Sequence, residues 1–221
     1  MIGILLSTSI AFTAQNSSKV ITYRADHNMV QIQYSEKDFK PWVVKAAKEL
    51  TIWYPKIAKL IGVKQNKPTQ PIVVVIKTHG NGVAGTMGHH IEVNGDYLRG
   101  HMNDVGMIVH EETHVVQAYP TYKPWWLVEG IADWVRWFHY EPKSARPHVN
   151  PATANYNQGY QVTASFLYWA NKKYDHSLVK DLSQALQANK YSKQIWVKDT
   201  GKSINELWST YIAQLKAKQG M

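Results

Sequence analysis

Two histidines stand four positions apart in an apolar part of the chain, in the pattern His-Glu-Glu-Thr-His at residues 110–114. Residues at this spacing differ by about 40° around a helix axis, so both imidazoles project from one face of a helix, one turn apart. This geometry suits two ligands of a tetrahedral zinc ion. The motif therefore constrains the fold: these residues must form a helix, and other parts of the chain must bring further ligands to it.

The residues around the motif favour a buried helix. Asp104 is a suitable N-cap, because the start of a helix needs an acceptor for its free amide groups. Tyr119 precedes a proline, which disfavours further helix. Burying an unpaired carboxylate costs several kcal/mol, so a buried helix with two glutamates favours a divalent cation beside them. The apolar cover of this helix comes from Val105, Ile108, Val109, Val115 and Val116.

A second helix is expected over residues 124–136, with a proline near its first turn. It is apolar on nearly every side except at Glu129, Asp133 and Arg136, which share one face at spacings of four and three. We assign Glu129 as the third metal ligand. Asp133, one turn further on, is expected to accept the second N–H of a ligating histidine and so to fix its tautomer.

An alternative third ligand would be a histidine six residues after the motif, as in the longer pattern HExxHxxGxxH. Position 120 is Pro120, so that alternative is excluded. Gly130 lacks a side chain where the two metal-site helices would need to approach closely. Arg136 has two candidate partners, Asp133 and a substrate carboxylate, between which the sequence does not choose.

With His110, His114 and Glu129 as ligands, a zinc ion keeps one coordination position for water. Glu111 lies beside the ligand face, where its carboxylate could accept the proton of that water and later deliver it to the leaving group. These residues predict metal-assisted hydrolysis with Glu111 as the general base. Glu112 is a spacer in the motif, for which we expect a local salt bridge or hydrogen bond.

Four segments together resemble the basic secretory protein family of plants and bacteria, which is regarded as a family of zinc peptidases. In these proteins, as in other gluzincins, HExxH is followed by Glu-x-x-x-Asp on the next helix. The resemblance extends from about residue 20 to residue 218 and shows no departure at the ligand positions. It implies a zincin-like fold and the zinc-dependent hydrolysis of a peptide or protein substrate. The four segments are residues 109–117, 127–136, 157–167 and 201–208.

In zincins, a strand of the N-terminal sheet pairs with an extended peptide beside the zinc, a form of β-augmentation. The resemblance places this strand within residues 85–93, with Gly85, Ile91 and Val93 as candidate substrate contacts. The same stretch is also typical of an edge hairpin with flexible glycines, and the sequence leaves both interpretations open.

The resemblance also indicates a group that stabilises the oxyanion, because gluzincins often recruit a tyrosine or histidine for this task. Tyr160 lies in a family-like segment near the start of a predicted helix and is our candidate. A phenol O–H directed at the developing oxyanion would stabilise the transition state. The chain has 13 tyrosines, so packing in the core is the alternative role.

The order of the expected elements predicts an α+β fold of zincin-like type. A small mixed sheet comes first, the active-site helix follows, and the C-terminal half is helical, with the cleft between sheet and helices. Residues 19–221 are expected to form a single peptidase domain. An early helix opens at Pro41, Pro55 kinks or restarts it, and a capping box from Ser203 to Glu206 opens the last helix. Strands are predicted at residues 20–23, 29–34, 71–78 and 91–93, and C-terminal helices at 158–173, 177–189 and 204–218.

Charge and composition limit the partners. Lys+Arg 25 against Asp+Glu 16 gives a net charge of +9, which favours anionic partners such as cell-wall or surface polymers. Nucleic acid is not expected, because the sequence has no helix-turn-helix, zinc-finger or RNP-type signature. The count of Cys 0 excludes disulfides and thiolate metal sites. The alternative function is a secreted cationic binding or defence-type protein with a structural or vestigial metal site.

The first residues resemble a signal peptide. Residues 2–12 form a short apolar run that ends among small residues, as in the hydrophobic region and cleavage zone of a leader. We interpret residues 1–18 as a signal peptide, or alternatively as a disordered N-terminus, and expect a secreted, periplasmic or cell-surface protein. The run lacks a basic region, which leaves a truncated or misassigned start as an option. A membrane span requires about 20 apolar residues, and no transmembrane segment is expected.

Two groups of residues receive structural interpretations. Adjacent histidines on a strand point to opposite faces, so we expect His89 and His90 to be exposed rather than to form a metal site. Four tryptophans at helical spacing are expected in the core rather than as a sugar-binding platform, namely Trp125, Trp126, Trp134 and Trp137.

Overall fold

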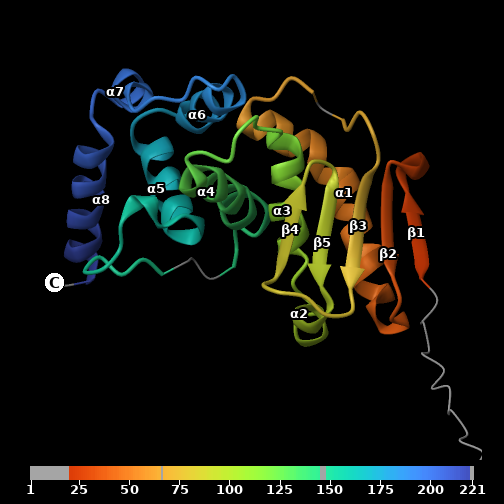
Figure 1. The fold of residues 1–221 in the computed structure, drawn as a ribbon. Coiled ribbons are helices and arrows are strands. Elements are labelled where there is room, and N and C mark those ends of the chain that lie inside the picture. Colours follow the sequence, from red (N-terminus) through yellow and green to blue (C-terminus); the bar gives the residue numbers. More distant parts are fainter. Residues whose placement is uncertain (1–19, 66, 145–147, 220–221) are drawn as a thin grey trace, which may run out of the picture.

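The computed structural model describes residues 20–65, 67–144 and 148–219 and has an α+β architecture. A five-stranded sheet occupies the N-terminal half, and the last helices lie at the opposite end of the molecule (Figure 1). The predicted fold class, a mixed N-terminal sheet followed by a helical C-terminal half, is confirmed. The expected signal peptide over residues 1–18 lies outside the described residues.

The sheet is mixed, with the spatial order β1-β2-β3-β5-β4. Two parallel pairings, β2 with β3 and β3 with β5, lie between antiparallel pairings at the two edges. Parallel neighbours need a crossover connection, and the helix α1 (Lys40–Ile61) supplies it between β2 and β3. Since β4 is last in this order, one of its backbone edges has no partner strand among the described residues. The strands are β1 (Ile21–Ala25), β2 (Val30–Tyr34), β3 (Ile72–Lys77), β4 (Ala84–Met87) and β5 (His90–Asn94).

One face of the sheet carries the core. In β2, Val30, Ile32 and Tyr34 are buried, whereas the residues between them are only half-buried. In β5, Ile91 and Val93 are buried, and Glu92 between them is exposed. Successive side chains of a strand point to opposite faces, so these residues mark the covered face. The helices α1 and α3 (Gly106–Gln117) pack against it (Figure 1).

The helix α1 continues through Pro55, so the predicted restart is wrong. Proline cannot donate the hydrogen bond that the carbonyl of Thr51 would receive in a regular helix. Pro55 is on the exposed side of α1, where solvent can reach this carbonyl, while Leu50 and Ile57 are buried in the core. The helix ends at Gly62, whose φ of 75° is the left-handed conformation that glycine adopts at low cost.

Two short helices, α2 (Gly95–Gly100) and α7 (Gln194–Thr200), were not predicted. Each is shorter than two turns, so neither shows the helical periodicity that detection from sequence depends on.

The predicted capping box of the last helix is confirmed. The backbone N–H of Glu206 donates to Ser203 Oγ at 3.3 Å, and the backbone N–H of Ser203 donates to Glu206 Oε2 at 2.7 Å. None of the helices within the described ranges has the length and hydrophobicity of a membrane span. The remaining helices are α4 (Trp125–Val135), α5 (Tyr160–Lys173), α6 (Leu178–Gln187) and α8 (Ile204–Gln219), with a π-helical turn at Arg136–Tyr140 after α4.

The helices α4 and α5 pack tightly against each other. A Cβ atom at Gly130 of α4 would overlap the side chain of Thr163 in α5, so glycine is required for this approach. We expected Gly130 to let the two metal-site helices approach; that expectation is wrong, because the close contact is with α5. One continuous cluster of buried side chains extends from Val30 in β2 to Tyr211 in α8.

Not all the tryptophans predicted for the core lie in it. Trp126 and Trp134 are buried, and Trp137 is half-buried. Trp125 is 46% exposed, so its expected core position is wrong. Its ring instead covers Gly159, where a Cβ atom would come within 2.5 Å of it.

Glu112 lies in the interface between α3 and α1 and is fully buried. Both of its carboxylate oxygens lack a hydrogen-bond partner among the described residues, so the expected local salt bridge or hydrogen bond is wrong. Burial, and after it the charge of Glu49 in α1, raises the pKa of Glu112 well above its usual value. The folded protein therefore holds this carboxyl in its neutral form.

We expect Glu112→Gln to raise the thermal stability at pH 8 and to leave it nearly unchanged at pH 4. A pKa that folding raises contributes stability that is complete below the unfolded value of 4.5 and is lost as the pH rises. Glutamine carries no charge to bury, so the variant should melt at least about 2 °C above the wild type at pH 8. Thermal melts across this pH range measure the difference, and a difference independent of pH would contradict the explanation.

Candidate metal centre

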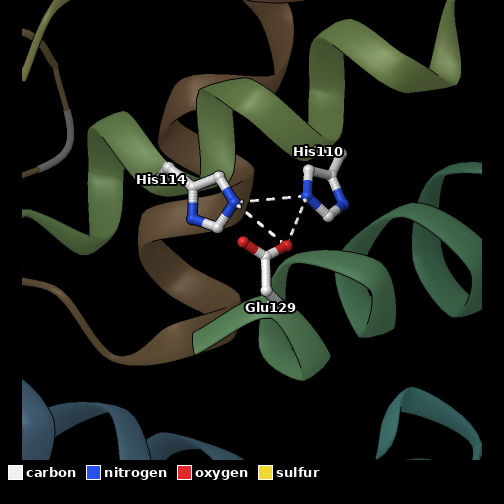
Figure 2. Close-up of side chains that lie close together, drawn as sticks. All are labelled: His110, His114 and Glu129. Atoms are coloured by element: carbon white, nitrogen blue, oxygen red, sulfur yellow. Dashed lines mark hydrogen bonds and ion pairs between the residues drawn. The ribbon is translucent and has the colours of Figure 1, made fainter. Parts of the chain in front are cut away.

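Three potential ligand atoms meet between α3 and α4 (Figure 2). The Nε2 atoms of His110 and His114 lie 3.2 Å apart. Glu129 Oε2 lies 3.1 Å from Nε2 of His110 and 3.6 Å from Nε2 of His114. The side chains that we predicted as ligands are therefore brought together, in an arrangement that could hold a metal ion.

The separations fit a tetrahedral site. Ligand atoms placed 2.0–2.1 Å from a zinc ion at tetrahedral angles lie about 3.3–3.4 Å from one another. The three observed separations of 3.1, 3.2 and 3.6 Å fall on both sides of that value. The side chains therefore need little movement to surround an ion.

An acceptor fixes the far side of each imidazole. His110 Nδ1 donates to Asp133 Oδ1 at 2.7 Å, and His114 Nδ1 donates to Gln117 Oε1 at 2.8 Å. The Gln117 amide is itself oriented, because its nitrogen donates to the carbonyl of Val128 at 3.0 Å. Donation through Nδ1 leaves Nε2 of each ring directed at the common point, as ligation of a metal ion requires.

Asp133 occupies the position expected of it, but sequence analysis missed Gln117. The signal was present, because Gln117 follows His114 by three residues and a helix places such residues on one face. Without a second helix to fix its amide, however, a glutamine at this spacing is also typical of a solvated surface.

The charges of the site are strongly coupled. Burial alone would lower the pKa of His110, but hydrogen bonds to Asp133 and Glu129 outweigh it and raise that pKa to about 10. Burial would raise the pKa of Glu129, but hydrogen bonds from His110 and His114 outweigh it and lower that pKa to about 2. Without a metal ion, a proton on the His110 ring therefore supplies the positive charge that faces Asp133 and Glu129.

Glu111 follows His110 on α3 and lines the same cleft. Its side chain is buried, and Thr86 of β4 donates a hydrogen bond to Glu111 Oε2 at 2.6 Å. Sequence analysis gave no sign of this contact, because Thr86 precedes Glu111 by 25 positions and belongs to a different element.

The site lies in a cleft of about 1170 Å³. One wall comes from the edge strand β4, and the other includes residues 118–122 and residues 158–162 at the start of α5. The cleft therefore lies between the sheet and the C-terminal helices, as predicted.

Tyr160 begins α5 at the border of this cleft and is 52% exposed, so it is not a core residue. Its ring stacks towards His110 with a centroid separation of 6.3 Å. Partial burial, followed by the charges of Glu129, Asp133 and Glu111, raises the pKa of the phenol. The phenol therefore keeps its proton.

Of the three candidate substrate contacts, one lines the cleft and two do not. Gly85 lies on the edge strand β4 and lines the cleft. Ile91 and Val93 lie on β5, are 0% exposed and face the core. Their assignment as substrate contacts is wrong, because β5 is paired on both sides and neither buried side chain lines the cleft.

Arg136 forms ion pairs with two acidic side chains other than its candidate partner Asp133. It donates to Asp104 Oδ1 at 2.7 Å and lies 3.5 Å from Glu141. Asp104 also accepts the backbone N–H of Met107 at 3.1 Å, so its carboxylate does satisfy an amide of the first turn of α3. The N-cap of this helix is nevertheless Val105, so the prediction of Asp104 as the N-cap is wrong by one position.

These observations describe an α+β protein with a buried His-His-Glu group and a neighbouring glutamate in a large cleft. The chain matches the family model described as BSP, peptidase of plants and bacteria, over residues 8–211. Because this match covers most of the chain, the protein belongs to that family, and the resemblance seen in the motifs is confirmed. No curated protein matches the chain.

Binding of a zinc ion at pH 7.5 should release close to one proton per ion. The pKa of His110 is raised to about 10, so its ring is protonated in the metal-free protein and must lose that proton to become a ligand. Apparent affinity should therefore rise about tenfold per pH unit between pH 6 and pH 9. Calorimetric titrations in buffers of different ionisation enthalpy count the protons, and a count near zero would contradict this charge assignment.

Proposed function

We propose that this protein is a zinc-dependent metallopeptidase, in which Glu111 acts as the general base. The observation that carries the proposal is the meeting of His110, His114 and Glu129 in a cleft that Glu111 also lines. Membership of a peptidase family supports peptide bonds as the substrate.

Two imidazole nitrogens and one carboxylate oxygen form a donor set that suits zinc. When bound, the ion lowers the pKa of a water molecule and polarises the carbonyl group of the substrate. Three protein ligands leave one position for water or substrate, whereas structural zinc sites are usually closed by four protein ligands. This difference favours a catalytic site over the alternative of a cationic binding protein with a structural metal.

In the reaction, Glu111 carries the proton. Its carboxylate accepts a proton from the attacking water and passes it to the nitrogen of the leaving amine, so the residue returns to its starting charge. His110 and His114 need no reorientation during this cycle, because Asp133 and Gln117 already fix their rings. Most of the geometry is therefore built before the substrate binds.

Tyr160 is the candidate for stabilising the oxyanion. Its protonated hydroxyl stands at the border of the cleft, and its ring is stacked towards the ligand His110. A donor directed at the carbonyl oxygen gains strength as negative charge develops there. The residue would therefore stabilise the transition state more than the bound substrate.

An extended peptide is expected to run along the free edge of β4. Strand addition uses backbone hydrogen bonds, which make few demands on the side chains of the substrate. At Gly85 the space that a Cβ atom would occupy is open, so no side chain crowds the face of the strand at this point.

We also propose a secreted, periplasmic or cell-surface location for the protein. Its net charge of +9 favours anionic surroundings.

Glu111→Gln should keep the metal content and lower kcat by about 100- to 10,000-fold, because an amide cannot accept the proton. Glu112→Gln is the matched control: it alters the neighbouring carboxylate, which points into the α1 interface, and should retain wild-type kcat. Metal analysis and hydrolysis of a denatured protein, with and without chelator, measure both properties. A fully active Glu111→Gln variant would remove Glu111 from the mechanism.

Tyr160→Phe should lower kcat at least about tenfold, because it removes one donor to the oxyanion. The metal content and KM should change little, since the ring and its stacking on His110 remain. Tyr23→Phe, in a tyrosine of the opposite edge strand β1 and outside the cleft lining, serves as the control. Equal turnover by the two variants would show that the Tyr160 hydroxyl has no part in the reaction.

A further inference from the structure

The side chain of Thr86 connects the edge strand of the sheet to the proposed general base. Its Oγ1 lies 2.6 Å from Glu111 Oε2 and 3.2 Å from the backbone carbonyl oxygen of Glu111. The short distance to a carboxylate is typical of a charge-assisted hydrogen bond, about twice as strong as one between neutral groups. The hydroxyl proton therefore points to Oε2.

The register of the β4–β5 hairpin places this hydroxyl. Thr86 pairs with Ile91, whose side chain is buried on the helix-covered face of the sheet. Directly paired residues share a face, so Thr86 points towards α3. Its neighbours Gly85 and Met87 are exposed on the other face, and only Thr86 among these three can reach Glu111.

We propose that Thr86 is a positioning residue, which holds the Glu111 carboxylate through Oε2 and directs the remaining oxygen into the cleft. The inference rests on the proposed peptidase function and deepens it. The hydroxyl touches neither the reacting atoms nor the ligand atoms, so its effect is exerted through Glu111.

The position of Thr86 also links substrate binding to the base. A peptide on the free edge of β4 would hydrogen-bond to the backbone of the same strand that holds the Glu111 carboxylate. A peptide paired with β4 would therefore order this strand, and the ordered strand would hold the Glu111 carboxylate in position. A glutamate side chain has three rotatable bonds, and misplacing a catalytic group by about 1 Å can cost about 100-fold in rate.

The test uses three variants of the full chain in the zinc-loaded state. Thr86→Val keeps the β-branched shape and removes the hydroxyl, and Thr86→Ser restores the hydroxyl without the methyl group. Thr22→Val alters a threonine of β1, the opposite edge strand, outside the cleft lining. We expect Thr86→Val to lower kcat by about 10- to 100-fold with KM and metal content within about twofold of wild type. Thr86→Ser should recover most of the activity, and Thr22→Val should equal the wild type.

Wild-type kcat in Thr86→Val would overturn the proposal. Equal losses in Thr86→Val and Thr86→Ser would also overturn it, because the shape of the strand rather than the hydroxyl would then be responsible.

A crystal structure of metal-free Thr86→Val provides a readout independent of turnover. The Glu111 carboxylate should leave the position that it has in the wild type, whereas an unchanged carboxylate would refute the positioning role. If the wild-type protein neither binds zinc nor hydrolyses peptides, the proposed function fails, and this structural comparison still decides whether Thr86 orients Glu111.

Discussion

The fold depends on one constraint: two imidazoles from α3 and a carboxylate from α4 occupy the same small, buried volume. His110 Nε2 lies within 3.2 Å of His114 Nε2 and within 3.1 Å of Glu129 Oε2. A cation at the centre and an acceptor behind each ring stabilise such a group. Asp133 and Gln117 supply those acceptors.

The rest of the molecule holds the two helices in place. The helix α3 is fixed on one side by α1 and on the other by β4, and α4 is fixed by its tight contact with α5 at Gly130. The helix α3 therefore presents different chemistry to each neighbour. Glu111 faces the cleft and Thr86, whereas Glu112, the next residue, is neutral and buried against α1.

Sequence reasoning succeeded where the geometry is local. Residues three or four apart on one helix share a face whatever the rest of the fold does. For this reason His110 with His114, and Glu129 with Asp133, could be paired from their spacing alone. The same rule would have found Gln117 beside His114. It could not find Thr86, because no spacing relates a strand residue to a helix residue 25 positions later.

Several predictions were wrong because they concerned contacts between different elements, whose geometry is not local. Gly130, Ile91 and Val93 were assigned to the site, but which neighbour they contact depends on how the elements pack. The chain alone determined which site residues of each helix share a face, because backbone geometry fixes the directions of nearby side chains. Only the tertiary structure decided that the two pairs meet, which glycine allows which contact, and which hydroxyl reaches Glu111. These contacts join residues whose relative positions are set by packing of the core rather than by the path of the local backbone.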